Sequence, residues 1–199
     1  MKTFRELLFP TPIYQKEFPD AKNLNKHLAK HIIAWSKKDK GETKTNSGGG
    51  WHSPTDMHER DEYQPLVKPF FIGNMWCNIN YPGAYNKVHI HPNSTWSGAY
   101  YIKIPKDSGC IWVEDPRPGP QHIMPRRLNN LPRQLWRVVK YPMTEGSCIM
   151  FPSWVPHGVE SNDSKEKGTK GWRISVSFNF IQGNGDSTAY IRNQWETQK

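Results

Sequence analysis

Near the middle of the chain lies the stretch Asn80-Tyr-Pro-Gly-Ala-Tyr-Asn-Lys-Val-His-Ile-His-Pro92, around which the rest of the sequence can be arranged. It contains two histidines separated by one residue, His89 and His91. In an extended strand, residues i and i+2 point to the same face. Both imidazoles can therefore aim at one point, whereas Val88 and Ile90 are predicted to point the other way, into packing. The stretch predicts a strand that carries a pair of metal-ligand candidates.

A third histidine and an arginine follow further along the chain. His157 lies in the phrase Phe151-Pro-Ser-Trp-Val-Pro-His-Gly-Val159, and Arg173 opens the strand-like run Arg173-Ile-Ser-Val-Ser-Phe-Asn179. Two close ligands and a distant histidine can form a facial triad with open coordination positions, as in mononuclear iron sites. An arginine offers a forked partner for a carboxylate. The pattern predicts an iron site with an acidic cosubstrate; three structural histidines and a structural salt bridge are the alternatives.

The sequence on either side predicts a mainly β protein. Among 199 residues, 9 Trp, 8 Tyr and 8 Phe favour strands, and 17 Pro and 15 Gly favour turns and loops. Short strands separated by turn signals are typical of a sandwich or barrel. Besides the strand of the histidine pair and an edge strand at 7–14, strands are predicted over 75–80, 96–104, 110–114, 135–141, 147–151, 157–160 and 172–181.

One helix is predicted before these strands, followed by a flexible loop at 42–50. Asp20 is predicted to cap its N-terminus, and Gly41 to end the helix region. Four apolar residues at helical spacing are predicted to form its buried stripe: Leu24, Leu28, Ile32 and Trp35.

The length predicts a single domain over residues 1–199. We expect an N-terminal strand and helix region at 7–40, a β core at 75–181 and a polar tail at 182–199.

Charge and cysteine content bear on the partners and on the cellular setting. The net charge of +9 indicates attraction to anions such as a carboxylate cosubstrate, an acidic polypeptide or nucleic acid, and a solvated basic surface is the alternative. Three cysteines without C-x-x-C spacing favour a reduced, cytoplasmic setting. No apolar run approaches the length of a membrane-spanning helix, and the N-terminus is too short and too charged for a secretory signal.

Several phrases together resemble the 2-oxoglutarate/Fe(II)-dependent oxygenase superfamily, whose fold is the double-stranded β-helix, a cupin-like jelly roll. Within it, the chain resembles a poorly characterised group encoded by bacteria and phages and, more loosely, the prolyl-hydroxylase-like members. The resemblance covers residues 49–180. The phrases that carry it are Gly49-Gly-Trp51, Asn86 to Pro92, Ser97-Gly-Ala-Tyr-Tyr101, Glu114-Asp-Pro-Arg117, Phe151-Pro-Ser-Trp154 with His157, and Arg173-Ile-Ser-Val-Ser-Phe-Asn179.

The resemblance implies an enzyme, a hydroxylase that uses Fe(II), 2-oxoglutarate and dioxygen. Its metal ligands fall on His89, His91 and His157. His91 stands where the superfamily usually has a carboxylate, so the site carries one more positive charge than usual. Its cosubstrate motif falls on Arg173 and Ser175, which would hold the distal carboxylate of 2-oxoglutarate. Further contacts to the cosubstrate are expected from Asn78 and from Tyr81 or Tyr85.

Two other functions are compatible with the same residues. One is a cupin-like metal oxygenase that uses three histidines without 2-oxoglutarate. The other is a non-catalytic β-sandwich that binds a protein or nucleic acid through basic loops.

The segment 116–133, rich in proline and arginine, is predicted to be a flap that selects an anionic or protein-borne substrate. The alternative is a rigid surface loop that covers a sheet edge.

Overall fold

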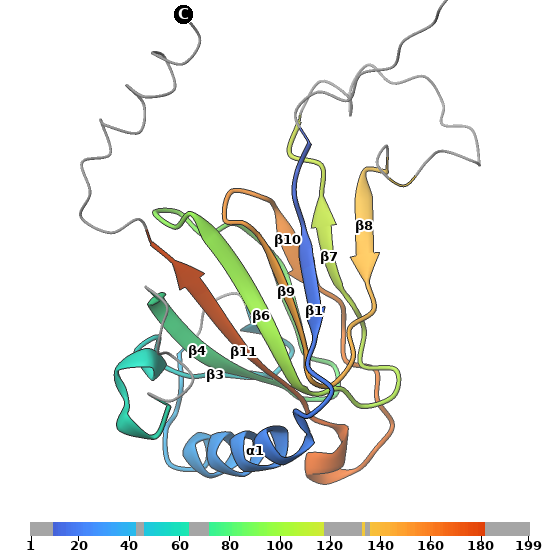
Figure 1. Cartoon of the computed structure of the whole chain (residues 1–199). Coiled ribbons are helices and arrows are strands. Elements are labelled where there is room, and N and C mark those ends of the chain that lie inside the picture. Colours follow the sequence, from blue (N-terminus) through green and yellow to red (C-terminus); the bar gives the residue numbers. More distant parts are fainter. Residues whose placement is uncertain (1–9, 43–45, 64–71, 118–132, 134–135, 182–199) are drawn as a thin grey trace, which may run out of the picture.

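The fold consists of two antiparallel β-sheets that face each other, with one α-helix on the outer side of the larger sheet (Figure 1). The computed structural model describes residues 10–42, 46–63, 72–117, 133 and 136–181. In order across the six-stranded sheet lie β1 (Tyr14–Glu17), β9 (Ser147–Pro152), β6 (Trp96–Lys103), β11 (Arg173–Phe180), β4 (Ile72–Asn80) and β3 (Trp51–His52). The five-stranded sheet contains β2 (Asn46–Ser47), β5 (Tyr85–His89), β10 (His157–Val159), β7 (Ile111–Glu114) and β8 (Val138–Tyr141).

Strand β11 is the central element of the larger sheet, because it pairs with β4 on one side and β6 on the other. Because side chains alternate along β11, one set faces the helix and the other set faces the second sheet. Ile174 and Val176 point outward to a core shared with the helix, while Arg173, Ser175 and Ser177 point into the space between the sheets. A second apolar cluster fills part of that space, and it includes Ala99, Tyr101, Ile111, Ile149 and Phe151. Polar residues therefore enter the interior along one face of β11.

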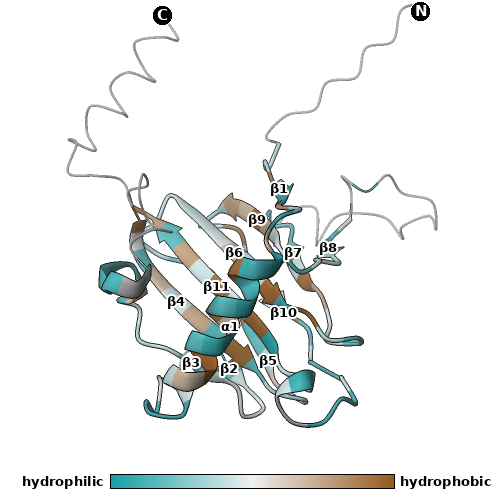
Figure 2. Ribbon diagram, turned by 60° about the horizontal axis from the view of Figure 1, so that its bottom comes forward, coloured by the Kyte–Doolittle hydropathy of each residue, from teal (hydrophilic) through white to brown (hydrophobic). Residues whose placement is uncertain are grey.

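Helix α1 (Lys22–Ser36) covers the outer face of the six-stranded sheet, as Figure 2 shows, and this confirms the predicted helix on one sheet. Leu28 and Ile32 are buried in the core shared with β11. Two details of the helix prediction are wrong. Ala21, not Asp20, occupies the N-cap, and no side chain caps the helix. Leu24 is 41% exposed, because the buried stripe includes Asn25, whose Oδ1 accepts a hydrogen bond from Tyr100 Oη at 2.6 Å.

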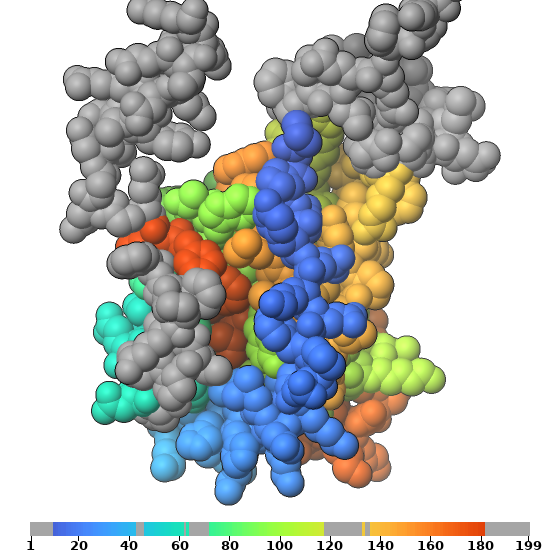
Figure 3. All heavy atoms as spheres, in the orientation of Figure 1, coloured from blue at the N-terminus to red at the C-terminus, as the bar shows by residue number. Residues whose placement is uncertain are grey.

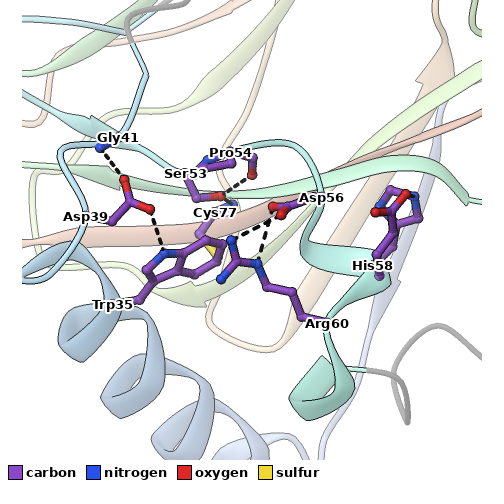
Figure 4. A network of polar contacts seen from close by, with 10 residues as sticks. Trp35, Asp39, Gly41, Ser53, Pro54, Asp56, His58, Arg60 and Cys77 are labelled. Atoms are coloured by element: carbon purple, nitrogen blue, oxygen red, sulfur yellow. Dashed lines mark hydrogen bonds and ion pairs between the residues drawn. The ribbon is translucent and has the colours of Figure 1, made fainter.

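Polar contacts fasten the end of this helix to the segment that follows (Figure 4). Asp39 accepts hydrogen bonds from Trp35 Nε1 at 3.2 Å and from the backbone N–H of Gly41 at 2.7 Å. Gly41 has φ +69°, a conformation that favours glycine, and lies beyond the helix. Arg60 stacks over the Trp35 ring at 3.9 Å and pairs with Asp56 at 3.1 Å. The 3-10 helices in the described part are η1 (Met57–Glu59), η2 (Asp61–Tyr63) and η4 (Gly168–Gly171).

Several element boundaries differ from those predicted, and three of them lie in segments away from the histidines. The edge strand lies at Tyr14–Glu17 rather than 7–14, and residues 1–9 are outside the described part. Figure 3 shows the described residues from β1 to α1 as a continuous blue band. The predicted loop 42–50 contains the short strand β2, and β8 begins at Val138 rather than 135. Within the described residues, no helix combines the length and the apolar character needed to cross a membrane.

The corrected helix face can be tested by two substitutions on the same helix. Ile32→Ala should destabilise the protein by about 2–5 kcal/mol, because Ile32 is fully buried and its removal leaves a cavity. Leu24→Ala should change the free energy of unfolding by less than about 0.5 kcal/mol, because Leu24 lies at the surface. Urea denaturation of both variants measures the two values. Equal losses would contradict the helix orientation described above.

Candidate metal centre and cosubstrate pocket

The structure brings His89, His91 and His157 together between the sheets. His89 ends β5, His157 begins β10, and the two residues are direct partners across these antiparallel strands. His91 follows β5 and is held by its backbone N–H, which donates to the carbonyl of Ser153 at 2.9 Å. One ring nitrogen from each histidine lies within 4.8 Å of the others. The three side chains thus converge on one point from two strands and one loop.

The strand predicted to carry both histidines ends earlier than expected. β5 stops at His89, so His91 reaches the centre through its loop contact with Ser153 and not by strand alternation. Val88 and Ile90, which were predicted to point into packing, are 54% and 47% exposed. This part of the prediction is wrong because helix α1 covers the other sheet, which leaves the outer side of β5 facing solvent.

Hydrogen bonds fix the protonation pattern of two of the three rings. Nδ1 of His157 lies 2.9 Å from the carbonyl oxygen of Val155, and Nδ1 of His89 lies 2.7 Å from that of Lys87. A carbonyl oxygen only accepts, so each Nδ1 carries the proton and donates it. Nε2 of each ring is then an unprotonated lone-pair donor, which is the arrangement found in metal-binding histidines.

Burial keeps these imidazoles neutral. It is the main cause that lowers the pKa of His157 to about 3 and that of His91 to about 4, and the neighbouring His89 contributes to both shifts. Burial also lowers the pKa of His89. At neutral pH all three rings are therefore uncharged, the state in which an imidazole can bind a cation. Ligand type, convergence and protonation state together fit a divalent metal such as Fe(II).

Arg173 places a positive charge in the same interior space. It is 2% exposed at the start of β11, and its guanidinium donates to the backbone carbonyls of Ser108 and of Glu160, the latter at 3.1 Å. Among the described residues, no ion pair includes Arg173. Burial lowers the pKa of Arg173. Because a buried charge is costly unless it is paired, this guanidinium is suited to an anion from outside the chain.

One cavity connects the imidazoles with the arginine. It is lined by His89, His91, His157, Arg173 and by two further predicted site residues, Ser175 and Asn78. The Asn78 side chain donates from Nδ2 to Ser177 Oγ at 3.1 Å, and its Oδ1 is buried without a hydrogen-bond partner. Such an orphaned acceptor beside the cavity fits a polar ligand.

The two tyrosines predicted to contact the cosubstrate do not line this cavity. The ring of Tyr81 lies 4.8 Å from that of Trp172 and packs against the core shared with the helix. Tyr85 is an exposed residue of β5. Both tyrosines are close to the histidines in the sequence, but their side chains do not point into the cavity. The structure offers Tyr101 instead, a buried residue of β6 that lines the cavity next to Ser175 in the strand register.

Several lining residues were not predicted as site residues, among them Tyr101, Ser177 and Asn86. Ser177 follows Ser175 by two positions on β11, so strand alternation alone could have identified it. Asn86 is held by Asn80, whose Nδ2 donates to Asn86 Oδ1 at 3.1 Å. No sequence signal indicated that contact.

The predicted flap at 116–133 lies almost entirely outside the described residues, which end at Arg117 and resume at Arg133. Arg117 pairs with Asp115 at 2.7 Å, and the Arg133 guanidinium lies over the Tyr141 ring at 5.0 Å. Both arginines therefore have partners within the chain.

Several solved structures share the fold at low sequence identity. A prolyl-4-hydroxylase from Pseudomonas putida matches with a TM-score of 0.52 at 13% identity, over 86% of this chain and 93% of the other. The α-ketoglutarate-dependent carbocyclase SnoK of nogalamycin biosynthesis matches with a TM-score of 0.62 at 12% identity, over 90% and 86%. AviO1 from Streptomyces viridochromogenes matches with a TM-score of 0.55 at 14% identity, over 88% and 92%. These likenesses confirm the double-stranded β-helix fold. A search of curated proteins found no match.

A family comparison covers the strands that carry the site. Residues 74–179 match the family described as "Putative 2OG-Fe(II) oxygenase". This range begins in β4 and ends in β11, so it contains the three histidines, Arg173 and Ser175. The match extends over more than half of the chain. The chain therefore belongs to the 2OG-Fe(II) oxygenase family, and it is an Fe(II)- and 2-oxoglutarate-dependent dioxygenase.

Proposed function

We propose that His89, His91 and His157 hold the iron, and that Arg173 and Ser175 hold the distal carboxylate of 2-oxoglutarate. The observation that carries this assignment is the buried, unpaired guanidinium in the cavity where three neutral imidazoles converge. An iron oxygenase that used no keto acid would have no need of a buried cation there. Asn78, with its orphaned Oδ1, and Tyr101 are the further residues that we assign to the cosubstrate pocket.

Bound Fe(II) supplies the centre at which 2-oxoglutarate and dioxygen react, with release of carbon dioxide and succinate. The chain contributes binding, orientation and the exclusion of water. The Arg173 fork fixes one end of the keto acid, so that its other end is directed toward the imidazoles. Ile111, Phe151 and Val159 form apolar walls of the same cavity, which strengthens the charge–charge contact by lowering the local dielectric.

We further propose that the reaction is a hydroxylation in the cytoplasm. The likeness to a prolyl-4-hydroxylase supports this reaction, although structures described as a carbocyclase and an epimerase share the fold. Cys77, Cys110 and Cys148 are all free, which supports a reducing compartment. The net charge of +9 supports an anionic or protein-borne substrate.

The proposal is tested with wild-type protein prepared without oxygen. Titration with Fe(II) should give one ion per chain, and 2-oxoglutarate should then bind to the iron-loaded protein. Glutarate, which has the distal carboxylate but no keto group, should compete weakly. Admission of oxygen should produce succinate in slow, uncoupled turnover. Iron binding without any binding of 2-oxoglutarate would favour the cupin-like oxygenase with three histidines and would contradict the assignment of Arg173.

A further inference from the structure

His91 differs from the other two histidines in what faces its Nδ1 atom. His89 and His157 each present Nδ1 to a backbone carbonyl, whereas Nδ1 of His91 lies 3.5 Å from Nδ2 of Asn179. Asn179 is a buried residue of β11 and was not predicted as a site residue. Nδ1 of His91 therefore faces a side-chain amide, whereas Nδ1 of His89 and of His157 each face a carbonyl oxygen, which can only accept a hydrogen bond.

Asn179 belongs to a chain of polar side chains beneath the three histidines. Its Oδ1 accepts a hydrogen bond from Ser97 Oγ at 2.7 Å, and its Nδ2 donates to Asn74 Oδ1 at 2.8 Å. Ser97 Oγ also lies 2.7 Å from Ser153 Oγ. The backbone carbonyl of the same Ser153 accepts the backbone N–H of His91. The network thus holds both the ring and the backbone of this one histidine.

The two ends of an amide have the same shape but opposite hydrogen-bonding roles, so this network can run in two directions. In the direction drawn above, Asn179 Nδ2 donates to Nδ1 of His91. His91 then keeps its proton on Nε2 and can donate it to Nε2 of His157, 3.2 Å away. In this direction the proton occupies the atom that a metal would need.

The opposite direction also gives the Asn179 amide, Ser97 Oγ and His91 Nδ1 a partner each. If the amides of Asn179 and Asn74 both turn over, Asn179 Oδ1 accepts from His91 Nδ1–H and from the Asn74 amide. Asn179 Nδ2 then donates to Ser97 Oγ, and Ser97 donates to Ser153. His91 Nε2 becomes an unprotonated lone-pair donor, as in the other two rings. A histidine that binds metal through Nε2 needs such an acceptor at Nδ1.

We propose that Asn179 is the positioning residue of His91, and that its amide turns over when metal binds, moving the His91 proton from Nε2 to Nδ1. This inference rests on the proposed function, in which His91 is a ligand. No net proton is gained or lost in the step, because the ring is neutral in both forms. His91 replaces the usual carboxylate ligand, and the network makes that replacement workable by giving the imidazole a switchable partner.

Zinc, a diamagnetic ion, is the probe for this switch. Long-range 1H–15N NMR of the ring nitrogens should show His91 protonated on Nε2 in metal-free protein and on Nδ1 after zinc is added. A His91 ring that already carries its proton on Nδ1 without metal would overturn the switch. If the three rings of wild-type protein do not respond to zinc at all, the proposed metal site and this inference are both wrong.

Substitutions of Asn179 test whether it positions His91 or only packs in the interior. Asn179→Ala should weaken zinc and Fe(II) binding by about 10–100-fold, the range for loss of a hydrogen-bond partner of a ligating histidine. Asn179→Asp should restore affinity, because a carboxylate accepts from Nδ1–H and returns the negative charge absent from the ligand set. Asn25→Ala is the matched control, since Asn25 is a buried amide bonded to Tyr100 on the far side of the sheet. It should lower stability but leave metal affinity unchanged. Wild-type zinc affinity in folded Asn179→Ala would overturn the inference while leaving the metal site intact.

Discussion

The His157→Ala variant is expected to lose stoichiometric iron binding, and with it all formation of succinate from 2-oxoglutarate. His157 is the most deeply buried of the three imidazoles, and its Nδ1–H bond to the Val155 carbonyl aims Nε2 at the other two rings. Removal leaves two side-chain ligands, of which His91 is held by a loop rather than by a strand. Two neutral imidazoles cannot complete the facial set of three that mononuclear Fe(II) sites use.

Metal analysis after anaerobic loading and desalting measures this effect directly. His27→Ala is the control, because His27 is exposed on helix α1, remote from the converging rings. It should bind one iron per chain, as the wild type does. Thermal denaturation of both variants checks that they are folded. A folded His157→Ala protein with full iron occupancy would refute the assignment of the metal ligands.

The second large effect is expected at Arg173. Arg173→Ala should weaken the binding of 2-oxoglutarate to the iron-loaded protein by about 2–5 kcal/mol, the range for truncation of one partner of a buried charge pair. The value corresponds to a Kd at least about 30-fold higher. Iron binding should persist, because Arg173 is not one of the three proposed ligands and is proposed to contact only the keto acid. Arg173→Lys should recover part of the affinity, since lysine keeps the charge but lacks the fork.

Calorimetric titration of 2-oxoglutarate into iron-loaded protein, without oxygen, measures the affinity of each variant and of the wild type. Arg137→Ala is a suitable control, because Arg137 is an exposed arginine that pairs with Glu114 at 2.9 Å on the surface. Surface ion pairs contribute about 0–1 kcal/mol, and this one is not part of the cavity. If Arg173→Ala binds 2-oxoglutarate as tightly as the wild type, the distal carboxylate must be held elsewhere, and Arg173 has a structural role.

Much of the site could be predicted from local sequence, because strand alternation has a period of two that needs no tertiary information. Trp76, Asn78 and Asn80 alternate along β4 on one face, and all three line the cavity. Arg173 and Ser175, on which the resemblance placed the cosubstrate motif, likewise lie on one face of β11. The polar side chains on these cavity-facing sides of β4 and β11 distinguish them from the apolar sides of the same strands. Strand and turn signals predicted a mainly β sandwich or barrel, and the resemblance implied the double-stranded β-helix, which the structure and the comparisons confirm.

Other features depended on contacts between residues far apart in the chain. In helix α1, Asn25 is buried and accepts a hydrogen bond from Tyr100, whereas Leu24 lies at the surface. Tyr81 was drawn away from the cavity by packing against Trp172, some ninety residues later in the sequence. Neither contact can be detected in the local periodicity of the sequence. Propensity and spacing alone therefore predicted a buried Leu24 and a cavity-facing Tyr81.

The sequence by itself determined which residue types are available for the site: three histidines, one arginine and the alternating strands that carry most of them. Only the tertiary structure decided how the third ligand candidate is presented. β5 ends before His91, and the backbone carbonyl of Ser153 and the amide of Asn179 orient its ring instead. Local geometry can place a side chain on one face of a strand. The direction of a ring in a loop depends instead on hydrogen bonds to distant segments, which exist only once the two sheets have packed together.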